Sequence, residues 1–378
     1  MTIIILYNLE RINTATKACV ENMHSRERVQ RAINLEEADR VPVDLIWPTA
    51  YIVGELKRAL KVNSEEECLR ALGVDVRWVS PGTAAGWKSR TFEDGSWDDE
   101  WGVRWWGYYN TTRVVHHPLA SAQDTSDIEK FSWLDPQAPE RLESLGRDLD
   151  GISPDYGIIF GAGGNLLERS WYLRGFKEFL IDLRSRRKMA EAILDRVMDF
   201  HRGITVAALE KFGDRIDVVF TADDLGDQKN LFFTPQLWRD VFKPRYASLF
   251  SEYKKHGVKV MFHSDGNCFP LIPDLVDAGL DILNPVQPMA SQMDPASVKE
   301  AFGDRLAFHG TICIQRTLPF GTADDVRAEV MERLGTVAVG GGLILSPTHS
   351  VLADVPVENI IALYDAVNKY GMYSRNAM

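Results

Sequence analysis

The alternation of short apolar runs with long amphipathic runs, from Val41 onward, is the feature that most constrains the fold of this chain. This alternation is typical of parallel β-α units, because a parallel strand needs a crossover helix before its neighbour. Eight candidate strands follow the pattern: 41–46, 74–79, 157–160, 217–220, 258–262, 281–283, 306–308 and 342–345. Helices are expected between them, most clearly over 189–212, 235–255, 269–278, 323–338 and 356–370. The sequence therefore predicts an α/β fold, a distorted (β/α)8 barrel of the TIM type.

One segment, residues 86–117, breaks this alternation. It contains Trp87, Trp97, Trp101, Trp105 and Trp106 and the turn formers Asp94-Gly95, so it is interpreted as an inserted β-hairpin. Two interpretations of the tryptophans stay open. They pack a small satellite core over the barrel, or some of them form a wall of a substrate pocket.

The ends of the chain set the predicted domain limits. Residues 1–22 lack a firm pattern and are interpreted as an N-terminal extension, either disordered or artefactual. Residues 23–378 are expected to form a single barrel domain, with 86–117 as its insertion.

Charge and cysteine content narrow the class of partner. The net charge of −11 argues against nucleic acid and against an anionic membrane surface, both of which need clustered Lys and Arg. Four cysteines without CxxC spacing indicate neither a disulfide framework nor a zinc ribbon. No apolar run reaches the ~18 residues that span a bilayer. The expectation is a cytoplasmic enzyme with a small-molecule substrate, whose oligomeric state stays open between monomer and homodimer.

Polar side chains follow the predicted strands where the catalytic mouth of a barrel lies. Asp223 and Asp224 follow strand 217–220, and His309 follows 306–308; all three are catalytic candidates, since such groups serve as acids or bases. For His309 the alternative is a buried, hydrogen-bonded histidine. For the two aspartates the alternative is a helix cap.

Several further residues follow strands in the same way. Strand 258–262 runs into His263-Ser264-Asp265-Gly266, and the last strand is followed by His349. The His-x-Asp spacing places two potential ligands on one side of a turn, where Gly266 lets the backbone approach closely.

Four stretches carry a resemblance to a known family. They are Asp224-Leu225-Gly226-Asp227-Gln228 with Thr234-Pro235, then His263-Ser264-Asp265-Gly266-Asn267, then Gly310-Thr311 with Leu318-Pro319-Phe320-Gly321-Thr322, and residues 341–349 with Asp354-Val355-Pro356. On these stretches the chain from about Met23 to Tyr370 resembles the uroporphyrinogen decarboxylase superfamily, which includes corrinoid-dependent methyltransferases. The resemblance implies a distorted (β/α)8 barrel, in agreement with the alternation of strands and helices.

The chain departs from the decarboxylases of this superfamily near its N-terminus. Those enzymes have an arginine-containing run that holds the carboxylates of a porphyrinogen, whereas residues 43–50 here contain no arginine. The mouth offers carboxylates instead, including Asp44. Because an unpaired buried charge is costly, decarboxylation of a porphyrinogen is not expected.

The methyltransferase branch implies a catalytic zinc ion, held by a His-x-Cys pair and a later Cys. The corresponding positions here are His263-x-Asp265 and His349. Imidazole and carboxylate leave a metal a stronger Lewis acid than thiolates do, which suits polarisation of an ether oxygen. The resemblance therefore implies Zn²⁺ bound by His263, Asp265 and His349. The alternative is that these side chains hydrogen-bond an organic substrate without metal.

Four residues complete the expected site as substrate-binding candidates. They are Gln228, Glu168, Asn284 and Trp47. Cys268 and Cys313 are weaker candidates for soft metal ligands, since most buried cysteines are inert.

The leading functional hypothesis is a methyltransferase of a corrinoid-dependent demethylation system. It moves methyl from a small methoxylated or methylated substrate to a corrinoid protein. The chain has no Asp-x-His-x-x-Gly motif for cobalamin, so the corrinoid is expected on a separate partner protein. The alternatives are a decarboxylase-like lyase acting on a small carboxylated substrate and a catalytically silent tetrapyrrole-binding protein.

Overall fold

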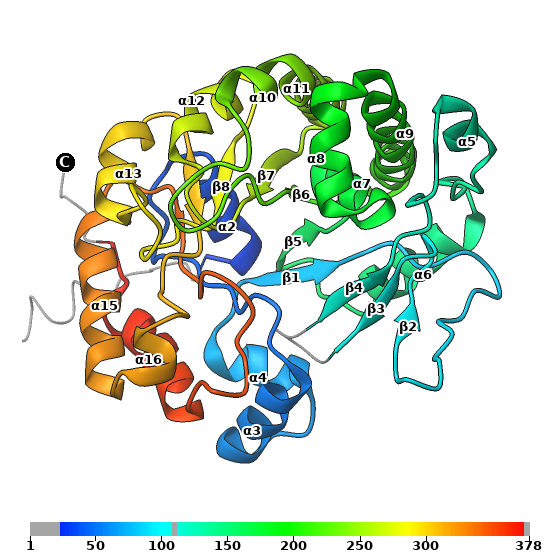
Figure 1. The fold of residues 1–378 in the computed structure, drawn as a ribbon. Helices are drawn as coiled ribbons and strands as arrows, with labels where there is room; N and C mark the ends of the chain where they lie inside the picture. The colour runs from blue at the N-terminus through cyan, green and yellow to red at the C-terminus, as the bar shows by residue number, and fades with distance from the viewer. Residues whose placement is uncertain (1–22, 108–111, 374–378) are drawn as a thin grey trace, which may run out of the picture.

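A curled sheet of seven parallel strands forms the centre of the computed structural model, which describes residues 23–107 and 112–373 (Figure 1). The order in the sheet is β1 (Val76–Val79), β5 (Gly157–Phe160), β6 (Val218–Ala222), β7 (Lys259–His263), β8 (Ile282–Asn284), β9 (Ala307–His309) and β10 (Leu343–Ile344). Seven of the eight predicted strands are therefore present, each within about two residues of its expected limits.

The eighth predicted strand, 41–46, is irregular, yet it joins the two edges of the sheet. On one side Asp44 N donates to Leu345 O at 3.0 Å and Leu345 N donates to Pro42 O at 2.9 Å. On the other side Asp75 N donates to Val43 O at 2.9 Å. Pro42 has no N–H to donate, which limits regular ladder pairing. The predicted distorted (β/α)8 barrel is confirmed.

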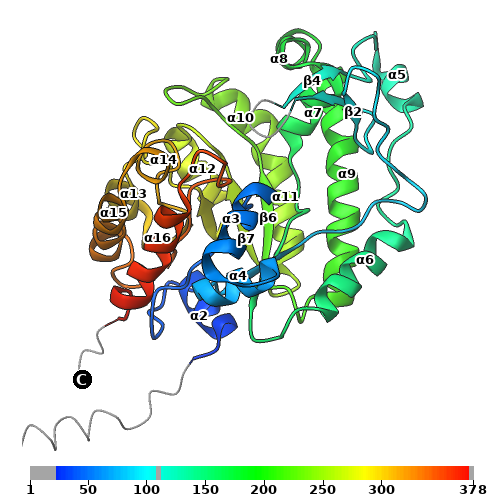
Figure 2. The ribbon, with the colours of Figure 1, turned by 90° about the horizontal axis from the view of Figure 1, so that it is seen from below.

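Helices surround the sheet, with α9 on one side and α15 and α16 on the opposite side (Figures 1 and 2). Within the described residues the helices are α2 (Ser25–Ile33), α3 (Ala50–Leu60), α4 (Glu65–Leu72), α5 (Thr125–Lys130), α6 (Pro139–Asp150), α7 (Leu166–Arg174), α8 (Phe176–Ser185), α9 (Arg187–Phe212), α10 (Pro235–Val241), α11 (Lys243–Lys254), α12 (Ile272–Asp277), α13 (Pro295–Phe302), α14 (Thr317–Phe320), α15 (Ala323–Thr336) and α16 (Val357–Tyr370). None of the helices among the described residues is long and apolar enough to cross a membrane.

Two of the predicted helices are interrupted at prolines. The expected helix 235–255 is divided into α10 and α11, because Pro244 lacks an N–H and its ring clashes with a continuous helical backbone. The expected helix 269–278 begins as the 3₁₀ turn η2 (Phe269–Leu271), which contains Pro270, and continues as α12.

The inside of the barrel is filled by one apolar layer. Each of the seven strands contributes to this layer, and α2 covers it at the N-terminal ends of the strands. Its members include Val29, Ile33, Val76, Ile159, Val218, Met261, Ile282, Ala307 and Ile344. Because α2 covers the N-terminal ends of the strands, a ligand has access only from their C-terminal ends.

A buried carboxylate fixes α2 to the barrel. Asp75, which is fully buried, accepts hydrogen bonds from Arg28 at 2.6 Å, Arg40 at 2.7 Å and Ser25 at 2.8 Å. It also accepts from Val43 N at 2.9 Å, so the Asp75 side chain joins α2 to the irregular segment 41–46.

The tryptophan-rich insertion is an antiparallel sheet of three strands, which confirms the predicted hairpin insertion and adds one strand to it. Its strands are β2 (Trp97–Asp98), β3 (Arg104–Trp106) and β4 (Arg113–His116), in that order. The extra strand forms because β3 pairs on both of its edges. Trp97 stacks on Trp105 with ring centroids 6.1 Å apart, and Trp105 packs on Tyr172 of α7 at 4.8 Å. These contacts support the satellite-core interpretation for this pair.

Candidate functional site

Three potential metal ligands meet at the C-terminal end of the barrel. His263 is the last residue of β7, Asp265 follows it in the next turn, and His349 follows β10. One ligand atom of each lies within 4.8 Å of the others. His263 Nε2 and Asp265 Oδ1 lie 3.8 Å apart. The structure thus brings together the three residues that the sequence predicts as metal ligands, although His263 and His349 are 86 positions apart in the sequence.

The orientation of His263 is fixed by a buried amide. His263 Nδ1 lies 2.6 Å from Asn284 Oδ1, and Asn284 Nδ2 lies 2.7 Å from His309 Nδ1. Because Asn284 Oδ1 can only accept, His263 donates from Nδ1, and its Nε2 keeps a lone pair facing Asp265. Asn284, expected to bind substrate, instead acts as a buried link between two histidines.

His309 is fully buried behind this link. Its Nε2 donates to Asp44 Oδ2 at 2.9 Å, and the same oxygen accepts from Trp78 Nε1 at 2.9 Å. Both ring nitrogens of His309 are therefore occupied by protein groups. This geometry matches the alternative of a hydrogen-bonded core histidine and gives His309 a positioning role.

Burial shapes the electrostatics of the other two metal candidates. Burial raises the pKa of Asp265 to about 6, with Asp224 adding to the shift and His263 opposing it. Asp265 Oδ1 is buried and has no hydrogen-bond partner among the described residues. Burial and, secondly, the nearby His263 lower the pKa of His349 to about 4. The neutral imidazole of His349, Nε2 of His263 and an unpartnered carboxylate oxygen form a donor set suited to a cation.

Trp47 packs against both candidate histidines, whose own ring centroids lie 5.4 Å apart. Its ring centroid lies 5.8 Å from that of His263 and 5.4 Å from that of His349, and Phe220 meets it edge-on at 5.4 Å. Trp47 has φ +42, a conformation that costs energy in a non-glycine residue. The structure therefore places this substrate-binding candidate at the candidate metal centre, with its indole fixed there by a strained backbone.

The adjacent carboxylates Asp223 and Asp224 have different environments. Asp223 is fully buried and accepts from Leu167 N and Glu168 N, both at 2.8 Å, and from the Tyr246 hydroxyl. It therefore caps the first turn of α7 from outside that helix. This structural role corresponds to the capping alternative, so Asp224 is the member of the pair that remains for catalysis.

Asp224 supports the turn that carries the metal candidates. Its Oδ1 accepts from Asp265 N at 2.8 Å. Gly266 follows with φ +75, and a Cβ there would lie 2.4 Å from Asp227 O, so only glycine fits the turn.

Glu168 and Gln228 lie around this acidic turn. Burial, and then repulsion from Asp224, raise the pKa of Glu168 to about 7, while its Oε1 accepts from the Tyr172 hydroxyl at 2.8 Å. Gln228 is exposed, and its Nε2 donates to Gln287 Oε1 at 2.9 Å. Gln287 Oε1 also accepts from Gly266 N at 2.8 Å, so Gln228 supports the turn from outside.

Several supporting residues were not predicted from the sequence. Trp78 and Tyr246 act through side-chain contacts between distant segments, for which no local pattern exists, whereas Gln287 comes just after strand 281–283, a position that indicates the mouth. Tyr172 lies four residues after Glu168 on one helix, and this spacing could have indicated their contact.

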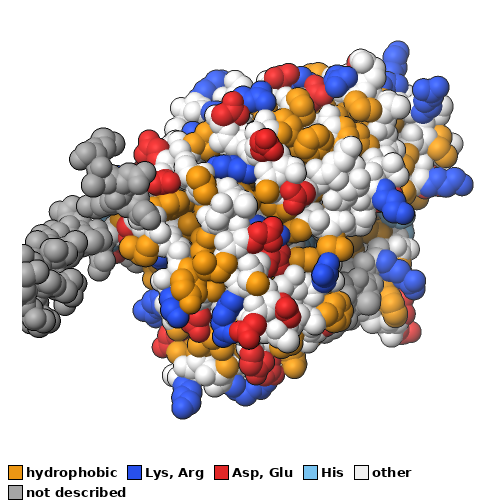
Figure 3. All heavy atoms as spheres, turned by 90° about the vertical axis from the view of Figure 1, so that its left-hand side faces the viewer, with side chains coloured by type: hydrophobic (Ala, Val, Ile, Leu, Met, Phe, Trp, Pro, Cys, Tyr) orange, Lys and Arg blue, Asp and Glu red, His pale blue; other side chains and the backbone are white. Residues whose placement is uncertain are grey.

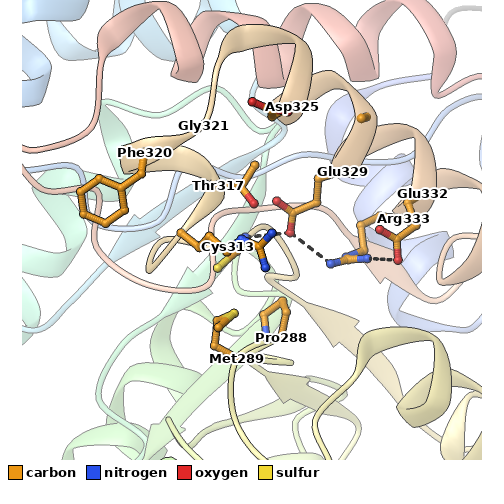
Figure 4. A pocket seen from close by; sticks show the side chains of 12 residues that line it. Pro288, Met289, Cys313, Thr317, Phe320, Gly321, Asp325, Glu329, Glu332 and Arg333 are labelled. Carbon is orange, nitrogen blue, oxygen red and sulfur yellow. Dashed lines mark hydrogen bonds and ion pairs between the residues drawn. The ribbon is translucent and has the colours of Figure 1, made fainter.

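Cys268 and Cys313, the weaker candidates for metal ligands, are not part of the cluster of His263, Asp265 and His349. Burial raises the pKa of Cys268 to about 12, which keeps it an uncharged thiol. Cys313 lines a separate cavity of about 690 Å³ beside α14 and α15, where Glu329 lies between Cys313 and Arg333, with Pro288 and Met289 close by (Figure 4). Glu329 Oε1 accepts from Cys313 N and from Arg333, each at 3.1 Å. Apart from Cys313, none of the predicted catalytic, substrate-binding or metal residues lines this cavity.

The outer surface beside α13 and α15 carries mixed charge. Figure 3 views this side, on which basic and acidic side chains are interspersed with hydrophobic ones rather than gathered by sign. This distribution agrees with the small-molecule substrate expected from the net charge.

Solved structures with similar folds include enzymes. A methyltransferase from Methanosarcina mazei is similar over 92% of this chain and 99% of its own, with a TM-score of 0.66 and 20% identity. At lower similarity, the YdhT protein from Bacillus subtilis covers 92% of this chain and 90% of its own, with a TM-score of 0.43 and 9% identity. D-psicose 3-epimerase from Clostridium cellulolyticum H10 covers 88% of this chain and 97% of its own, with a TM-score of 0.38 and 10% identity. The first similarity shows a shared barrel fold.

Sequence comparison gives the family. The search of curated protein sequences found no match to this chain. The family model described as uroporphyrinogen decarboxylase matches residues 102–370, well over half of the chain, and includes the turns that carry His263, Asp265 and His349. The chain therefore belongs to the uroporphyrinogen decarboxylase family.

Proposed function

We propose that this chain is a methyltransferase of a corrinoid-dependent demethylation system. It takes methyl from a small methoxylated or methylated substrate and passes it to a separate corrinoid protein. The observation that carries this proposal is the cluster of His263, Asp265 and His349 at the open end of the barrel. The similarity of the fold to a Methanosarcina mazei methyltransferase supports it.

The cluster fits a zinc ion in its donor chemistry, and one of its ligand pairs is spaced nearly as on zinc. Two ligands on tetrahedral zinc, each about 2.0–2.1 Å from the ion, lie about 3.4 Å apart. The 3.8 Å between His263 Nε2 and Asp265 Oδ1 is close to that value. His263 is oriented by Asn284, as metal-ligating histidines commonly are by a hydrogen bond to the second ring nitrogen. Zinc bound there would supply a Lewis acid that polarises the ether oxygen of a methoxy group.

The atoms of the proposed transfer balance with a partner in the cob(I)alamin state. The C–O bond of the methoxy group breaks, and its methyl carbon bonds to cobalt, which is formally oxidised from Co(I) to Co(III). The substrate oxygen keeps the C–O electron pair and takes a proton. Glu168, with its pKa raised to about 7, holds a proton in a large fraction of molecules at neutral pH and is the proposed donor.

A decarboxylase-like lyase is the second candidate, and the family supports it. The charges near the site favour it less. Asp224 and Asp265 both contribute to the raised pKa of Glu168, so three acids already repel one another. A carboxylate substrate would add to this repulsion, whereas a neutral ether would not.

Zinc content tests the proposal. We would dialyse wild type and the double variant His263→Ala, Asp265→Ala against chelator, reload them with zinc, and measure metal by elemental analysis. The expected result is about one zinc ion per wild-type chain, the stoichiometry of a single site, and none in the variant. The matched control is His24→Ala, because the His24 side chain is 71% exposed and lies outside the cluster.

Two outcomes would contradict the proposal. Equal zinc content in wild type and in the double variant would show that His263 and Asp265 do not bind the metal. Release of carbon dioxide from a carboxylated substrate without any corrinoid protein, together with no methyl transfer to cob(I)alamin, would establish the lyase instead.

A further inference from the structure

A cavity of about 350 Å³ lies in the barrel wall, between β1 and the irregular segment that contains Asp44. Asp75 N donates to Val43 O where this segment meets β1, but no backbone hydrogen bond among the described residues joins 44–48 to β1. The wall is therefore open beyond Val43, and residues of α4 line the opening. This space, called the seam cavity below, has a volume within the range of small-molecule sites, about 300–1,000 Å³.

A buried carboxylate with a free oxygen lines the seam cavity. Asp44 is 1% exposed, and its Oδ2 accepts from Trp78 Nε1 and from His309 Nε2, both at 2.9 Å. Its Oδ1 accepts no hydrogen bond from the described residues, and it is not among their fully enclosed atoms without a partner. Oδ1 is therefore the oxygen with access to the cavity. A carboxylate oxygen with free lone pairs in such a place requires a donor, and a charged donor binds it most strongly.

The orientation of this carboxylate is fixed from inside the barrel. His309 Nδ1 accepts from Asn284 Nδ2 at 2.7 Å, so His309 carries its proton on Nε2. The indole nitrogen of Trp78 can only donate. Both groups need an acceptor at Oδ2, and Asp44 cannot turn away without leaving them unpaired. Oδ1 therefore stays directed to the seam cavity.

The charged groups of the lining favour a cation. Glu65 and Glu66 of α4 line the cavity together with Asp44, against one guanidinium, that of Arg77. Arg77 is already bound to Glu66, through Nε at 2.7 Å and Nη2 at 3.0 Å. Among the described residues no Lys or Arg pairs with Asp44 or Glu65. The cavity therefore attracts cations and repels anions.

The apolar part of the lining favours an organic cation over a metal ion. Trp47 and Trp78 line the cavity with ring centroids 5.4 Å apart, and Leu69 of α4 adds aliphatic surface. Indole rings attract ammonium groups and cover their carbon atoms. Asp44 belongs to no group of three potential metal ligands among the described residues. A carboxylate beside two indoles is thus suited to an ammonium group on a carbon skeleton.

We propose that the seam cavity binds a small organic ammonium ion. Its N–H donates to Asp44 Oδ1, and its carbon atoms lie against the two indoles and Leu69. Trp47 also packs on His263 and His349, so the bound ion lies beside the candidate metal centre and not in the mouth. The inference goes beyond the proposed methyl transfer and does not depend on it, because none of the metal candidates lines the seam cavity.

A matched pair of ligands tests the proposal on the unmodified chain. Titration calorimetry on zinc-free protein measures the affinity for phenethylammonium and for phenethyl alcohol, which has a hydroxyl in place of the ammonium. We expect the ammonium to bind about tenfold more tightly or better, because it alone forms a charge-assisted bond with the buried carboxylate. Equal affinities, or no binding of phenethylammonium, would overturn the proposal. This comparison does not depend on how a variant folds.

The variant Asp44→Asn locates the bound cation. Its amide oxygen can still accept from Trp78 and His309, so the contacts inside the barrel are kept while the charge is lost. The preference for the ammonium should disappear, with the affinity for phenethyl alcohol unchanged. A preference that persists in this variant would place the cation elsewhere on an acidic chain and overturn the proposal.

Two further variants separate the seam cavity from the mouth. Asp265→Asn removes a carboxylate charge at the mouth and should keep the preference for the ammonium; loss of the preference there, but not in Asp44→Asn, would overturn the seam assignment. Leu69→Phe fills the cavity from α4 without contact to the mouth residues and should weaken both ligands. Unchanged affinity for both ligands in Leu69→Phe would show that they bind outside the seam cavity.

Discussion

Replacement of Asn284 by Ala should weaken both the fold and the candidate metal centre. Asn284 is fully buried and joins His263 to His309 through bonds of 2.6 and 2.7 Å. Alanine leaves the Nδ1–H of His263 without an acceptor and Nδ1 of His309 without a donor. Each buried group left unpaired costs about 1–3 kcal/mol, so the free energy of unfolding should fall by about 2–6 kcal/mol.

The effect on zinc should be separable from the effect on stability. His263 would no longer be fixed in the tautomer that presents Nε2, and loss of such a supporting bond weakens metal binding about 10–100-fold. Urea denaturation would measure stability, and a competitive zinc titration with a chelator would measure affinity.

Asn267→Ala provides the matched control. Asn267 is also buried in this turn, and its side chain donates to Lys229 O at 2.9 Å and accepts from Phe269 N at 3.2 Å. Its replacement should reduce stability without changing zinc affinity, since it contacts neither histidine. If Asn284→Ala bound zinc as tightly as wild type, or if Asn267→Ala weakened zinc equally, the orienting role of Asn284 would be refuted.

Three further predictions concern carboxylates and their partners. The folded-state pKa of Glu168, raised by burial from 4.5 to about 7, means that stability present below pH ~4.5 is lost as pH rises through 7. As pH rises from 5 to 8, Glu168→Gln should therefore gain up to about 3 kcal/mol of stability relative to wild type in urea denaturation. A stability difference between the two proteins that does not change with pH would contradict this. Tyr246→Phe removes a hydrogen bond to buried Asp223 and should lower thermal stability by about 1–3 kcal/mol, with an unchanged melting temperature as the contrary result. Asp75→Asn leaves Arg40 without its buried counter-charge, while Arg28 keeps only its ion pair with Asp39, and should cost about 3–5 kcal/mol in urea denaturation, whereas a loss below 1 kcal/mol would show that the carboxylate is dispensable.

The parallel strands were predictable because strands that are buried on both faces have short, continuous apolar sequences. β5 is found at its predicted limits, 157–160, since all four of its residues are buried. The segment 41–46 is also mostly apolar, yet its pairing depends on Pro42 and on Asp75, a residue more than thirty positions later. Such pairing is determined by tertiary contacts, which an apolar pattern does not contain.

The candidate site was predictable in position more than in role. Polar residues at strand ends indicate the mouth, and this rule located His263, Asp265 and His349. It could not distinguish Asp223 from Asp224, because successive side chains leaving a strand point to opposite sides. Only the packed α7 shows that Asp223 is turned toward a helix end, and only Asp44 and Asn284 show that His309 faces the core.

The charges around the mouth bear on which substrates this member of the family can accept. Arg141 and Arg169, which line a cavity together with Phe220, are already paired with Glu100 and Asp99, at 2.7 and 2.8 Å. Across β6, the carboxyl group of Glu168 has a raised pKa because it is buried and near another acid. A polycarboxylate such as a porphyrinogen would have to break an existing ion pair for each arginine it used, which leaves a buried carboxylate unpaired. A neutral ether changes no charge on entry, so the same electrostatics that disfavour a polycarboxylate favour an uncharged substrate such as the proposed methyl donor.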